Sequence, residues 1–236
     1  MFSKEELDKL LINVGSRIGK SIKIYMIGGC ALSFKGLKAA TKDIDIIVTS
    51  KRDFDVFDKV MREAGFTLMT ERENEFYLTA LAVYIRGDES RIDVFLKQVG
   101  KMLRLTDSMI KRAELYKRYE GLTVYLLSNE DIFLFKSMTS RPGDLLDCDR
   151  LIKESLDYNL IYKEIVNQSS NGKRWFFWTY ESFCRLENHN NIRIPIKNKI
   201  FALVKKHWKE RPSDFMADIN NIENHIPDKK LLQELK

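Results

Sequence analysis

Apolar residues recur every three to four positions in two stretches near the start of the chain, as they do in amphipathic helices. The first stretch covers residues 3–20, where Ser3 and Glu6 form the capping-box pattern that is typical of a helix start. The second covers residues 53–64, and Gly65 follows it as a helix stop. We therefore predict one helix in each stretch.

A period of two replaces the helical period between and after these stretches. This alternation predicts strands over residues 22–27 and 43–48, and a hairpin of residues 75–85 and 90–96 that turns at Gly87-Asp88. Gly28-Gly29 follows the first strand and precedes a short helix over residues 30–34. The first part of the chain thus combines strands with helices.

The second part of the chain has mainly the helical period. We predict helices over residues 106–119, 128–137 and 144–155, a short strand over residues 122–127, and three or four helices after residue 160. Ser128 caps the second of these helices, and Arg141-Pro142-Gly143 forms a turn before the third. The order of elements predicts an α+β lobe over residues 1–105 and a helical lobe over residues 106–236, with the border inside residues 105–128.

Composition sets limits on the class of protein. The chain has 236 residues, 44% of them hydrophobic, but no run of about 18 uncharged apolar residues, which excludes an ordinary transmembrane helix. Its first ten residues carry acids and lysines where a secretory signal needs an apolar stretch. Cys30, Cys148 and Cys184 are odd in number and far apart, which argues against a disulfide framework or a cysteine zinc site. We expect a protein of the reducing cytoplasm with no membrane partner.

The positive charge of the chain is concentrated in its second half. Residues 1–100 hold 16 basic and 15 acidic side chains, whereas residues 101–236 hold 24 and 19, a net charge of +5. Residues 196–211 are the best candidate for nucleic-acid binding, because their lysines would contact phosphates without regard to base sequence. The structural alternative for these lysines is a solvated helical face. The aromatic cluster of residues 175–183, beside Lys173 and Arg174, suits stacking on unpaired bases, and its structural alternative is a helical core. A polyanionic partner is the functional hypothesis.

The pattern Asp43-Ile44-Asp45 is the sharpest candidate for chemistry. On a strand, side chains two residues apart share a face and lie about 6.6–6.8 Å apart along the chain. Two acids on one face repel each other unless a cation neutralises them, and a hard divalent cation prefers oxygen ligands. The structural alternative is a half-exposed strand with two solvated acids.

Two further features surround this pair in the sequence. Gly28-Gly29, at a strand-to-helix junction, would let backbone N–H groups approach a phosphate, although an ordinary turn has the same pattern. Asp93 lies between the apolar residues Ile92 and Val94 on a predicted strand, so its side chain points away from theirs. Asp93 is therefore a third candidate acid, or else an exposed strand acid.

Together these residues resemble the DNA polymerase β-like nucleotidyltransferase superfamily. The resemblance rests on Ile27-Gly28-Gly29, a thirteen-residue spacer, Asp43-Ile44-Asp45 and the later Asp93. Within the superfamily, residues 28–48 are most similar to the branch of the AbiEii-type toxin nucleotidyltransferases and related uncharacterised proteins. A second block of that branch matches Lys136, Arg141, Asp144 and Asp147, whereas Lys38 stands where relatives often carry arginine.

The resemblance implies a fold, a reaction and a set of site residues. The fold is a polymerase β-like lobe, a mixed sheet with flanking helices, followed by a helical lobe that closes the nucleotide cleft and binds the acceptor. The reaction is attack of a hydroxyl on the α-phosphate of a nucleoside triphosphate (NTP), with release of pyrophosphate. The catalytic and metal-binding residues are Asp43, Asp45 and Asp93, which would hold two Mg²⁺ ions, or Mn²⁺ in their place. The nucleotide-binding residues are Gly28, Gly29, Ser33, Lys136, Arg141 and Asp144. The structural alternatives are helix-surface positions for Ser33 and Lys136 and a helix N-cap for Asp144.

The acceptor stays open at this level. RNA, most of all a tRNA 3′ end, is the first hypothesis, because related toxins modify tRNA and the second half of this chain is basic. A protein hydroxyl (AMPylation) is the second, and a small hydroxylated molecule such as an antibiotic is the third. A toxin-type enzyme would also have a cognate antitoxin protein as its partner. The alternative of another class is a non-catalytic nucleotide- or RNA-binding protein.

Overall fold

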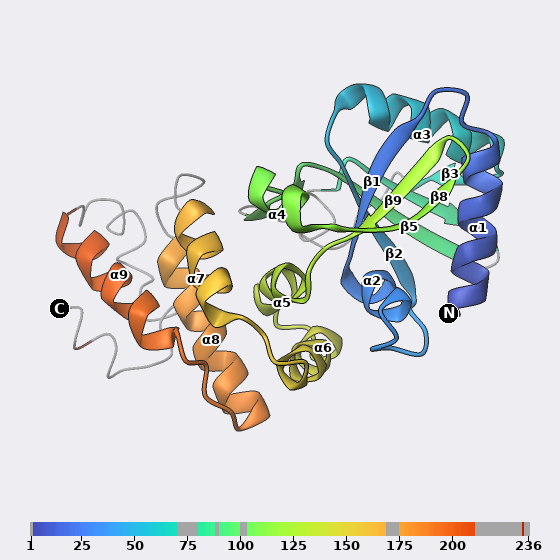
Figure 1. Ribbon diagram of the computed structural model, residues 1–236. Helices are drawn as coiled ribbons and strands as arrows, with labels where there is room; N and C mark the ends of the chain where they lie inside the picture. Colours follow the sequence, from blue (N-terminus) through green and yellow to red (C-terminus); the bar gives the residue numbers. More distant parts are fainter. Residues whose placement is uncertain are drawn as a thin grey trace. The chain divides into compact units, whose positions relative to one another are not determined.

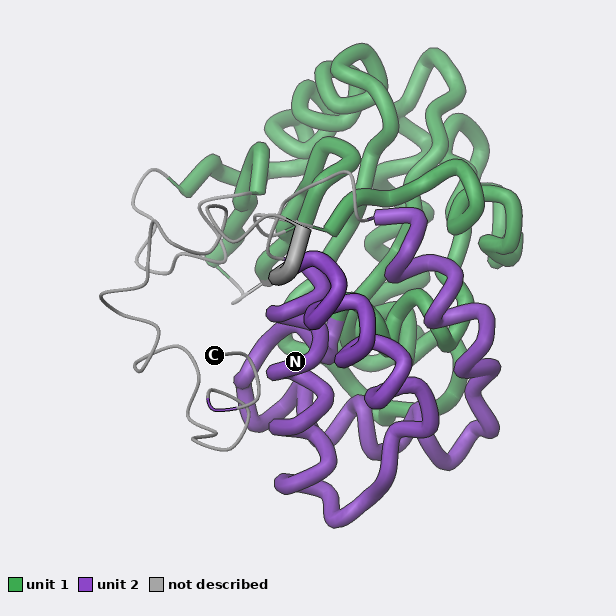
Figure 2. The backbone as a smooth tube through the Cα atoms, turned by 90° about the vertical axis from the view of Figure 1, so that its left-hand side faces the viewer, with its two compact units in different colours: residues 1–135 green, residues 136–236 purple. Residues whose placement is uncertain are grey.

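The chain divides between residues 135 and 136 into two units, each with its own core (Figure 2). The computed structural model describes residues 2–69, 80–87, 90–99, 103–168, 175–210 and 233. The sequence suggested a border inside residues 105–128, but the strands β8 (Glu114–Tyr119) and β9 (Leu122–Leu126) belong to the sheet of the first unit. They are tied to it by pairing of β9 with a strand about 100 residues earlier in the chain, which no local pattern reveals.

A seven-stranded mixed sheet forms the centre of the first unit (Figure 1). Its order is β3 (Thr67–Leu68), β4 (Ala82–Arg86), β5 (Ser90–Leu96), β2 (Asp43–Val48), β1 (Ile22–Ile27), β9 and β8. The strand β1 runs antiparallel to β2 and parallel to β9, while β2 runs parallel to β5. A separate two-stranded ladder joins β6 (Gln98–Val99) and β7 (Leu103–Arg104). The predicted mixed α+β architecture is confirmed.

Capping residues mark several helix starts of the first unit, and the helices predicted over residues 53–64 and 30–34 each begin two residues earlier, at Lys51 and Gly28. The first helix, α1 (Lys4–Ser16), has the complete capping box of Ser3 and Glu6. Ser50 caps α3 (Lys51–Glu63) by accepting a hydrogen bond from the Asp53 amide, and Ser128 accepts one from the Asp131 amide at the start of α5 (Asn129–Ser137). The short helix α2 (Gly28–Phe34) follows β1 without a loop.

The two faces of the sheet have different surroundings, and this difference positions the site. Tyr84 of β4 lies edge-on to Phe57 of α3, with ring centroids 6.4 Å apart, and its hydroxyl donates a 2.5 Å hydrogen bond to Asp58 of α3. Ile92 and Ile44 lie in register with Tyr84 and share its face, toward α3. Alternate residues of β2 and β5 therefore point to the opposite face.

Two predictions about local structure are wrong. The segment predicted as a helix over residues 106–119 is a short helix, α4 (Asp107–Arg112), followed by β8, because pairing with β9 outweighs the helical spacing of its basic residues. The predicted turn at Arg141-Pro142-Gly143 is instead the start of α6 (Pro142–Lys153), with Pro142 in the first turn. Proline suits that position, because the first helical amides have no intrahelical partner.

The described part of the second unit is helical, as predicted. It contains α6, α7 (Tyr158–Asn167), α8 (Trp175–Asn190) and α9 (Lys197–Glu210), and α8 packs against both α6 and α9. Trp175, Phe177 and Phe183 are buried, and the indole N–H of Trp175 donates to the Ile165 carbonyl at 2.6 Å. The structural alternative for the aromatic cluster is thus correct for these three side chains. No helix among the described residues is long and apolar enough to span a bilayer.

Several predicted features lie outside the described residues. They are the first part of the predicted hairpin strand, residues 75–79, its turn residue Asp88, and the basic residues Lys173, Arg174 and Arg211. The three cysteines, all of them described, are free thiols, as their number and spacing indicated.

Candidate active site on the first unit

Strand register brings the three predicted acids onto one face of the sheet. In the parallel pair of β2 and β5, Asp45 lies opposite Asp93 and Asp43 lies opposite Arg91. Because Ile44 and Ile92 face α3, the side chains of Asp43, Asp45 and Asp93 occupy the other face. Two adjacent strands thus place three carboxylates and one guanidinium in a compact block.

The acids of this block differ in their surroundings. Asp43 and Asp45 are half-buried, whereas the side chain of Asp93 is 0% exposed. Asp93 forms an ion pair with Arg91, whose Nε donates to Oδ1 at 2.9 Å and whose Nη2 lies 3.4 Å from Oδ2. The pairing is consistent with the cost of burying a carboxylate without a positive partner.

Gly28 lies directly against one of the acids. Its φ of +65° is in the region that favours glycine, and a Cβ at this position would lie 2.2 Å from Asp45 Oδ2. The strand pairing explains the contact, because Ile27, the last residue of β1, is in register with Asp45. The glycine thus lets the start of α2 approach the Asp45 carboxylate, whereas the predicted approach of its backbone to a phosphate stays a prediction.

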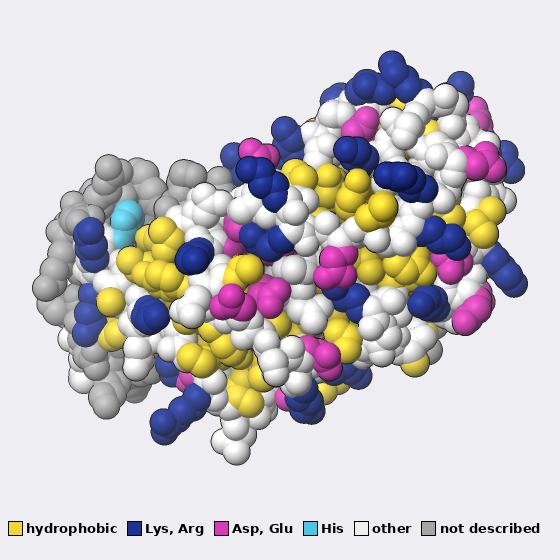
Figure 3. Space-filling model, in the orientation of Figure 1, with side chains coloured by type: hydrophobic (Ala, Val, Ile, Leu, Met, Phe, Trp, Pro, Cys, Tyr) yellow, Lys and Arg dark blue, Asp and Glu magenta, His cyan; other side chains and the backbone are white. Residues whose placement is uncertain are grey.

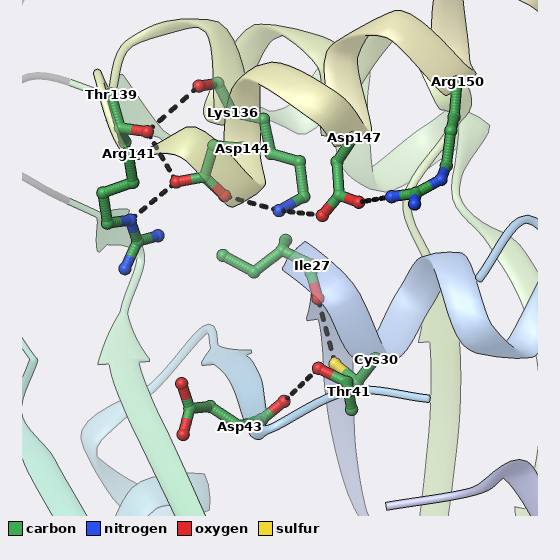
Figure 4. Close-up of polar contacts among 10 residues, drawn as sticks. All are labelled: Ile27, Cys30, Thr41, Asp43, Lys136, Thr139, Arg141, Asp144, Asp147 and Arg150. Carbon is green, nitrogen blue, oxygen red and sulfur yellow. Dashed lines mark hydrogen bonds and ion pairs between the residues drawn. The ribbon is translucent and has the colours of Figure 1, made fainter. Parts of the chain in front are cut away.

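Polar groups continue from Gly28 along the start of α2. A Cβ on Gly29 would lie 2.5 Å from Thr41 Oγ1 and 3.5 Å from the Lys38 ammonium. Figure 4 shows the Thr41 hydroxyl donating to the Asp43 carbonyl at 2.9 Å, and the Cys30 thiol donating to the Ile27 carbonyl at 3.0 Å. Cys30 is therefore buried, and its thiol is hydrogen-bonded to the backbone.

Ser33 Oγ is buried and makes no hydrogen bond to another described residue. A buried hydroxyl without a partner is unusual in a native protein. It leaves Ser33 with an unused donor, which is compatible with its predicted role as a phosphate ligand.

The residues present fit a divalent cation in the type of donor that they offer. Three carboxylates offer the hard oxygen donors that Mg²⁺ and Mn²⁺ prefer, and the neighbouring Asp45 and Asp93 share one face. Within the described ranges, however, no three His, Cys, Asp or Glu side chains are already grouped closely enough to hold an ion. In this structure the oxygens of Asp93 are engaged by Arg91 instead.

The second predicted block forms a buried ionic cluster within the second unit (Figure 4). The Lys136 ammonium lies 2.6 Å from Asp144 Oδ1 and 2.8 Å from Asp147 Oδ2. Arg141 donates to Asp144 Oδ2 and Arg150 to Asp147 Oδ1, both at 2.6 Å. Thr139 Oγ1 also donates to Asp144 at 2.5 Å. The two carboxylates thus hold three cations, of which Lys136 is the innermost.

Charge compensation sets the protonation states of this cluster. Burial alone would lower the pKa of Lys136, but Asp144 and Asp147 outweigh it, and the pKa is raised. Burial would likewise raise the pKa of Asp144, but Lys136, Thr139 and Arg141 outweigh it, and the pKa is lowered. Both groups are therefore charged at neutral pH.

The sequence patterns did not single out two charged residues, one beside the three acids of the sheet and one in the ionic cluster of the second unit. Arg91 was not singled out, although an arginine two residues before a strand acid must share its face. Arg150 was missed in the same way, three residues after Asp147 on α6. Both could have been found from spacing alone.

Comparisons with known proteins add the family. Residues 5–183 match the family described as "Nucleotidyltransferase of unknown function (DUF6036)". No curated protein sequence matches the chain.

Several solved structures are similar to the chain at low sequence identity. ANT(2″)-Ia in complex with adenylyl-2″-tobramycin is 14% identical, with a TM-score of 0.46 over 70% of this chain and 95% of its own. TM1012 from Thermotoga maritima is 13% identical, with a TM-score of 0.41 over 65% of this chain and 91% of its own. JHP933 from Helicobacter pylori is 14% identical, with a TM-score of 0.40 over 78% and 77%.

Proposed function

The chain belongs to the DUF6036 family of nucleotidyltransferases, and we propose that it moves a nucleotidyl group from an NTP to a hydroxyl on RNA, most of all a 3′ end. The observation that carries the proposal is the block of Asp43, Asp45 and Asp93 on one face of the sheet, beside the glycines that begin α2. The family supports the reaction, and the block supports the place where it occurs.

Asp43, Asp45 and Asp93 would hold the divalent metal, two Mg²⁺ ions in the full proposal. When bound, the metal neutralises charge on the α-phosphate and lowers the pKa of the attacking hydroxyl. Asp45 is fixed by the close approach of Gly28, and Asp93 by burial. Asp43 is half-buried and lies on β2 two residues before Asp45, on the same face.

The start of α2 would bind the phosphates of the nucleotide. Gly28 and Gly29 have no side chain of their own, so a phosphate oxygen would meet no Cβ on its approach to their backbone amides. Ser33 supplies an additional hydroxyl donor, and the Lys38 ammonium beside Gly29 supplies a positive charge. Neutralising the triphosphate in this way favours departure of pyrophosphate.

In the second unit we assign the nucleotide contact to Arg141, supported by Lys136 and Asp144. The Lys136 side chain is only 7% exposed and its ammonium is held between two carboxylates, whereas Arg141 is 42% exposed. The Nε of Arg141 donates to Asp144 Oδ2 at 2.6 Å, so this carboxylate holds the more exposed guanidinium in place. Lys136 would thus act by holding Asp144 in place.

The RNA acceptor is proposed from the charge of the second unit. On α9, Lys205 lies over the ring of Phe201 at 4.3 Å, and Lys199 lies over Tyr162 of α7 at 5.7 Å. Lysines beside aromatic rings suit a single strand, because phosphates and bases are bound together. On the face shown in Figure 3, basic side chains are interspersed with acidic and apolar ones, which favours a short contact over a long basic stripe.

The test is a transfer assay with purified protein, Mg²⁺, each of the four α-³²P-labelled NTPs and total RNA, resolved on a denaturing gel. The double variant Asp43→Ala/Asp45→Ala removes two of the proposed ligands. The matched control is Asp55→Ala, which removes an exposed acid of α3 that pairs with Lys51. We expect label in RNA for the wild type and the control, and none for the double variant.

The other outcomes separate the remaining hypotheses. Label on protein would indicate AMPylation instead of RNA transfer, and label on an added aminoglycoside would indicate modification of a small molecule instead. Binding of RNA or NTP without transfer to any of these acceptors would favour the non-catalytic alternative. If RNA is the acceptor, growth arrest on expression, relieved by a cognate antitoxin, would indicate a toxin-type role.

A further inference from the structure

We propose that Arg91 is a built-in counter-ion that occupies Asp93 in the metal-free enzyme and gives up one of its oxygens when a divalent cation binds. The inference rests on the proposed function, because it takes Asp93 as a metal ligand. It adds a residue that neither the family description nor the sequence pattern assigns.

The ion pair of Arg91 and Asp93 neutralises the buried carboxylate when no metal is bound. Arg91 engages both oxygens of Asp93, with Nε at 2.9 Å from Oδ1 and Nη2 at 3.4 Å from Oδ2. The Asp93 side chain is fully buried, so an unpaired negative charge there would be costly. Without metal, Arg91 supplies the compensating charge from two residues away on the same strand.

The strand register places Arg91 beside all three proposed metal ligands. Asp45 is the β2 neighbour of Asp93, and Asp43 is the β2 neighbour of Arg91, so the guanidinium belongs to the same block as all three proposed ligands. A cation bound by Asp45 and Asp93 would need a lone pair that Arg91 now holds. It would also experience the positive charge of the guanidinium within the same block.

Competition for Asp93 therefore sets the metal affinity of the enzyme. Arg91 weakens binding of the metal alone, and its side chain, 22% exposed, gives up one carboxylate oxygen when Asp93 is recruited. A purely structural arginine would stabilise the fold without changing the affinity for metal. The two roles are thus separated by a binding measurement.

The experiment compares wild type with Arg91→Gln by titration with Mn²⁺ alone, followed by electron paramagnetic resonance of the free ion. Thermal unfolding is recorded in chelator and in saturating Mn²⁺. The matched control is Arg62→Gln, because Arg62 also pairs through Nε with an aspartate, Asp58, at 3.0 Å, but on α3. Asp43→Asn/Asp45→Asn identifies the Mn²⁺ that binds at this block.

We expect Arg91→Gln to bind Mn²⁺ about tenfold more tightly than wild type, because one positive charge near the ion is removed. It should unfold at a lower temperature in chelator and gain more from Mn²⁺ than wild type does. Arg62→Gln should bind Mn²⁺ as wild type does. Unchanged or weaker Mn²⁺ binding by Arg91→Gln, with wild-type binding still lost in Asp43→Asn/Asp45→Asn, would overturn the role of Arg91 alone.

Failure of the proposed function has a different signature. If wild type and Arg91→Gln both fail to bind Mn²⁺, or bind it equally in the Asp43→Asn/Asp45→Asn background, the metal site and the inference are both rejected. If Arg91→Gln does not fold, Arg91→Lys provides the comparison, since a lysine keeps the charge but not the two-point contact. Tighter Mn²⁺ binding by Arg91→Lys supports competition for Asp93, and unchanged or weaker binding rejects it.

Discussion

Gly28 and Asp45 are in such close contact that a single methyl group cannot fit between them: a Cβ on Gly28 would lie 2.2 Å from Asp45 Oδ2. The contact joins the end of β1 to the middle of the acidic block, since Ile27 is in register with Asp45. It explains why α2 begins with a glycine and why the carboxylate and the proposed phosphate-binding backbone lie together.

Gly28→Ala should therefore damage both stability and activity. Strain at a φ of +65° costs about 1–2 kcal/mol in the free energy of unfolding, and displacement of Asp45 should lower transfer by about a hundredfold. Gly65→Ala is the control, because Gly65 has a φ of +84° but nothing within 4 Å of its Cβ position. Urea unfolding and transfer rates would check this, and equal activity of the two variants would refute it.

Asp43→Asn and Asp93→Asn should both abolish transfer but differ in stability. Asp43 is half-buried, whereas Asp93 is fully buried, so the change at Asp43 should stay within about 0.5 kcal/mol. Asp93→Asn removes the charge that Arg91 pairs with in a buried position and should cost about 1–3 kcal/mol. Chemical denaturation in chelator measures the difference. Equal stabilities would show that the Arg91 pair contributes nothing to the fold.

Lys136→Met should be strongly destabilising, by about 3–5 kcal/mol, because it leaves Asp144 and Asp147 buried without their shared cation. Lys153→Met is the matched control: Lys153 also pairs with an aspartate at 2.6 Å, Asp149, but on the exposed surface of α6. Its loss should cost less than about 0.5 kcal/mol. Similar unfolding midpoints for the two variants would contradict the buried role of Lys136.

The same cluster predicts a pH dependence. Burial opposes ionisation of Asp144, but Lys136 outweighs it, so the folded-state pKa lies below the ordinary value of 3.8. The stability that this group contributes is fully present above the unfolded-state pKa and is lost as pH falls through the folded-state value. The stability gap between wild type and Asp144→Asn should be constant between pH 5 and 7 and shrink below about pH 4. A stability gap that widens on acidification would contradict the predicted direction of the pH dependence.

The stability that Lys136 contributes should be lost at high pH, whereas that of Asp144 is lost at low pH. Burial would lower its pKa, but Asp144 and Asp147 raise it above the ordinary value of 10.5. Its contribution to stability is fully present below the unfolded-state pKa and is lost as pH rises through the folded-state value. The second unit should therefore keep its ionic cluster throughout the neutral range.

Local patterns in the sequence were sufficient wherever neighbours in the chain decide the structure. Ser3, Ser50 and Ser128 each accept a hydrogen bond from an amide three residues later, so helix starts follow from a four-residue signal. Alternation on β2 likewise placed Asp43 and Asp45 on one face. Residues 106–119 show the limit, because their helical spacing is overridden by pairing of β8 with β9.

Contacts between distant residues required the folded chain. Nothing local in residues 43–48 or 90–96 states that Asp45 and Asp93 are in register, or that β9 returns to lie beside β1. The position of Lys136 between Asp144 and Asp147 depends on how α5 and α6 pack, not on their separate patterns. The amino-acid order thus sets residue types, faces and helix starts, since these depend on bonds over a few residues. Register, burial and charge pairing depend on which distant surfaces pack together and exclude water. The pairing of Asp93 with Arg91, and of Lys136 with Asp144 and Asp147, is therefore seen only in the tertiary structure.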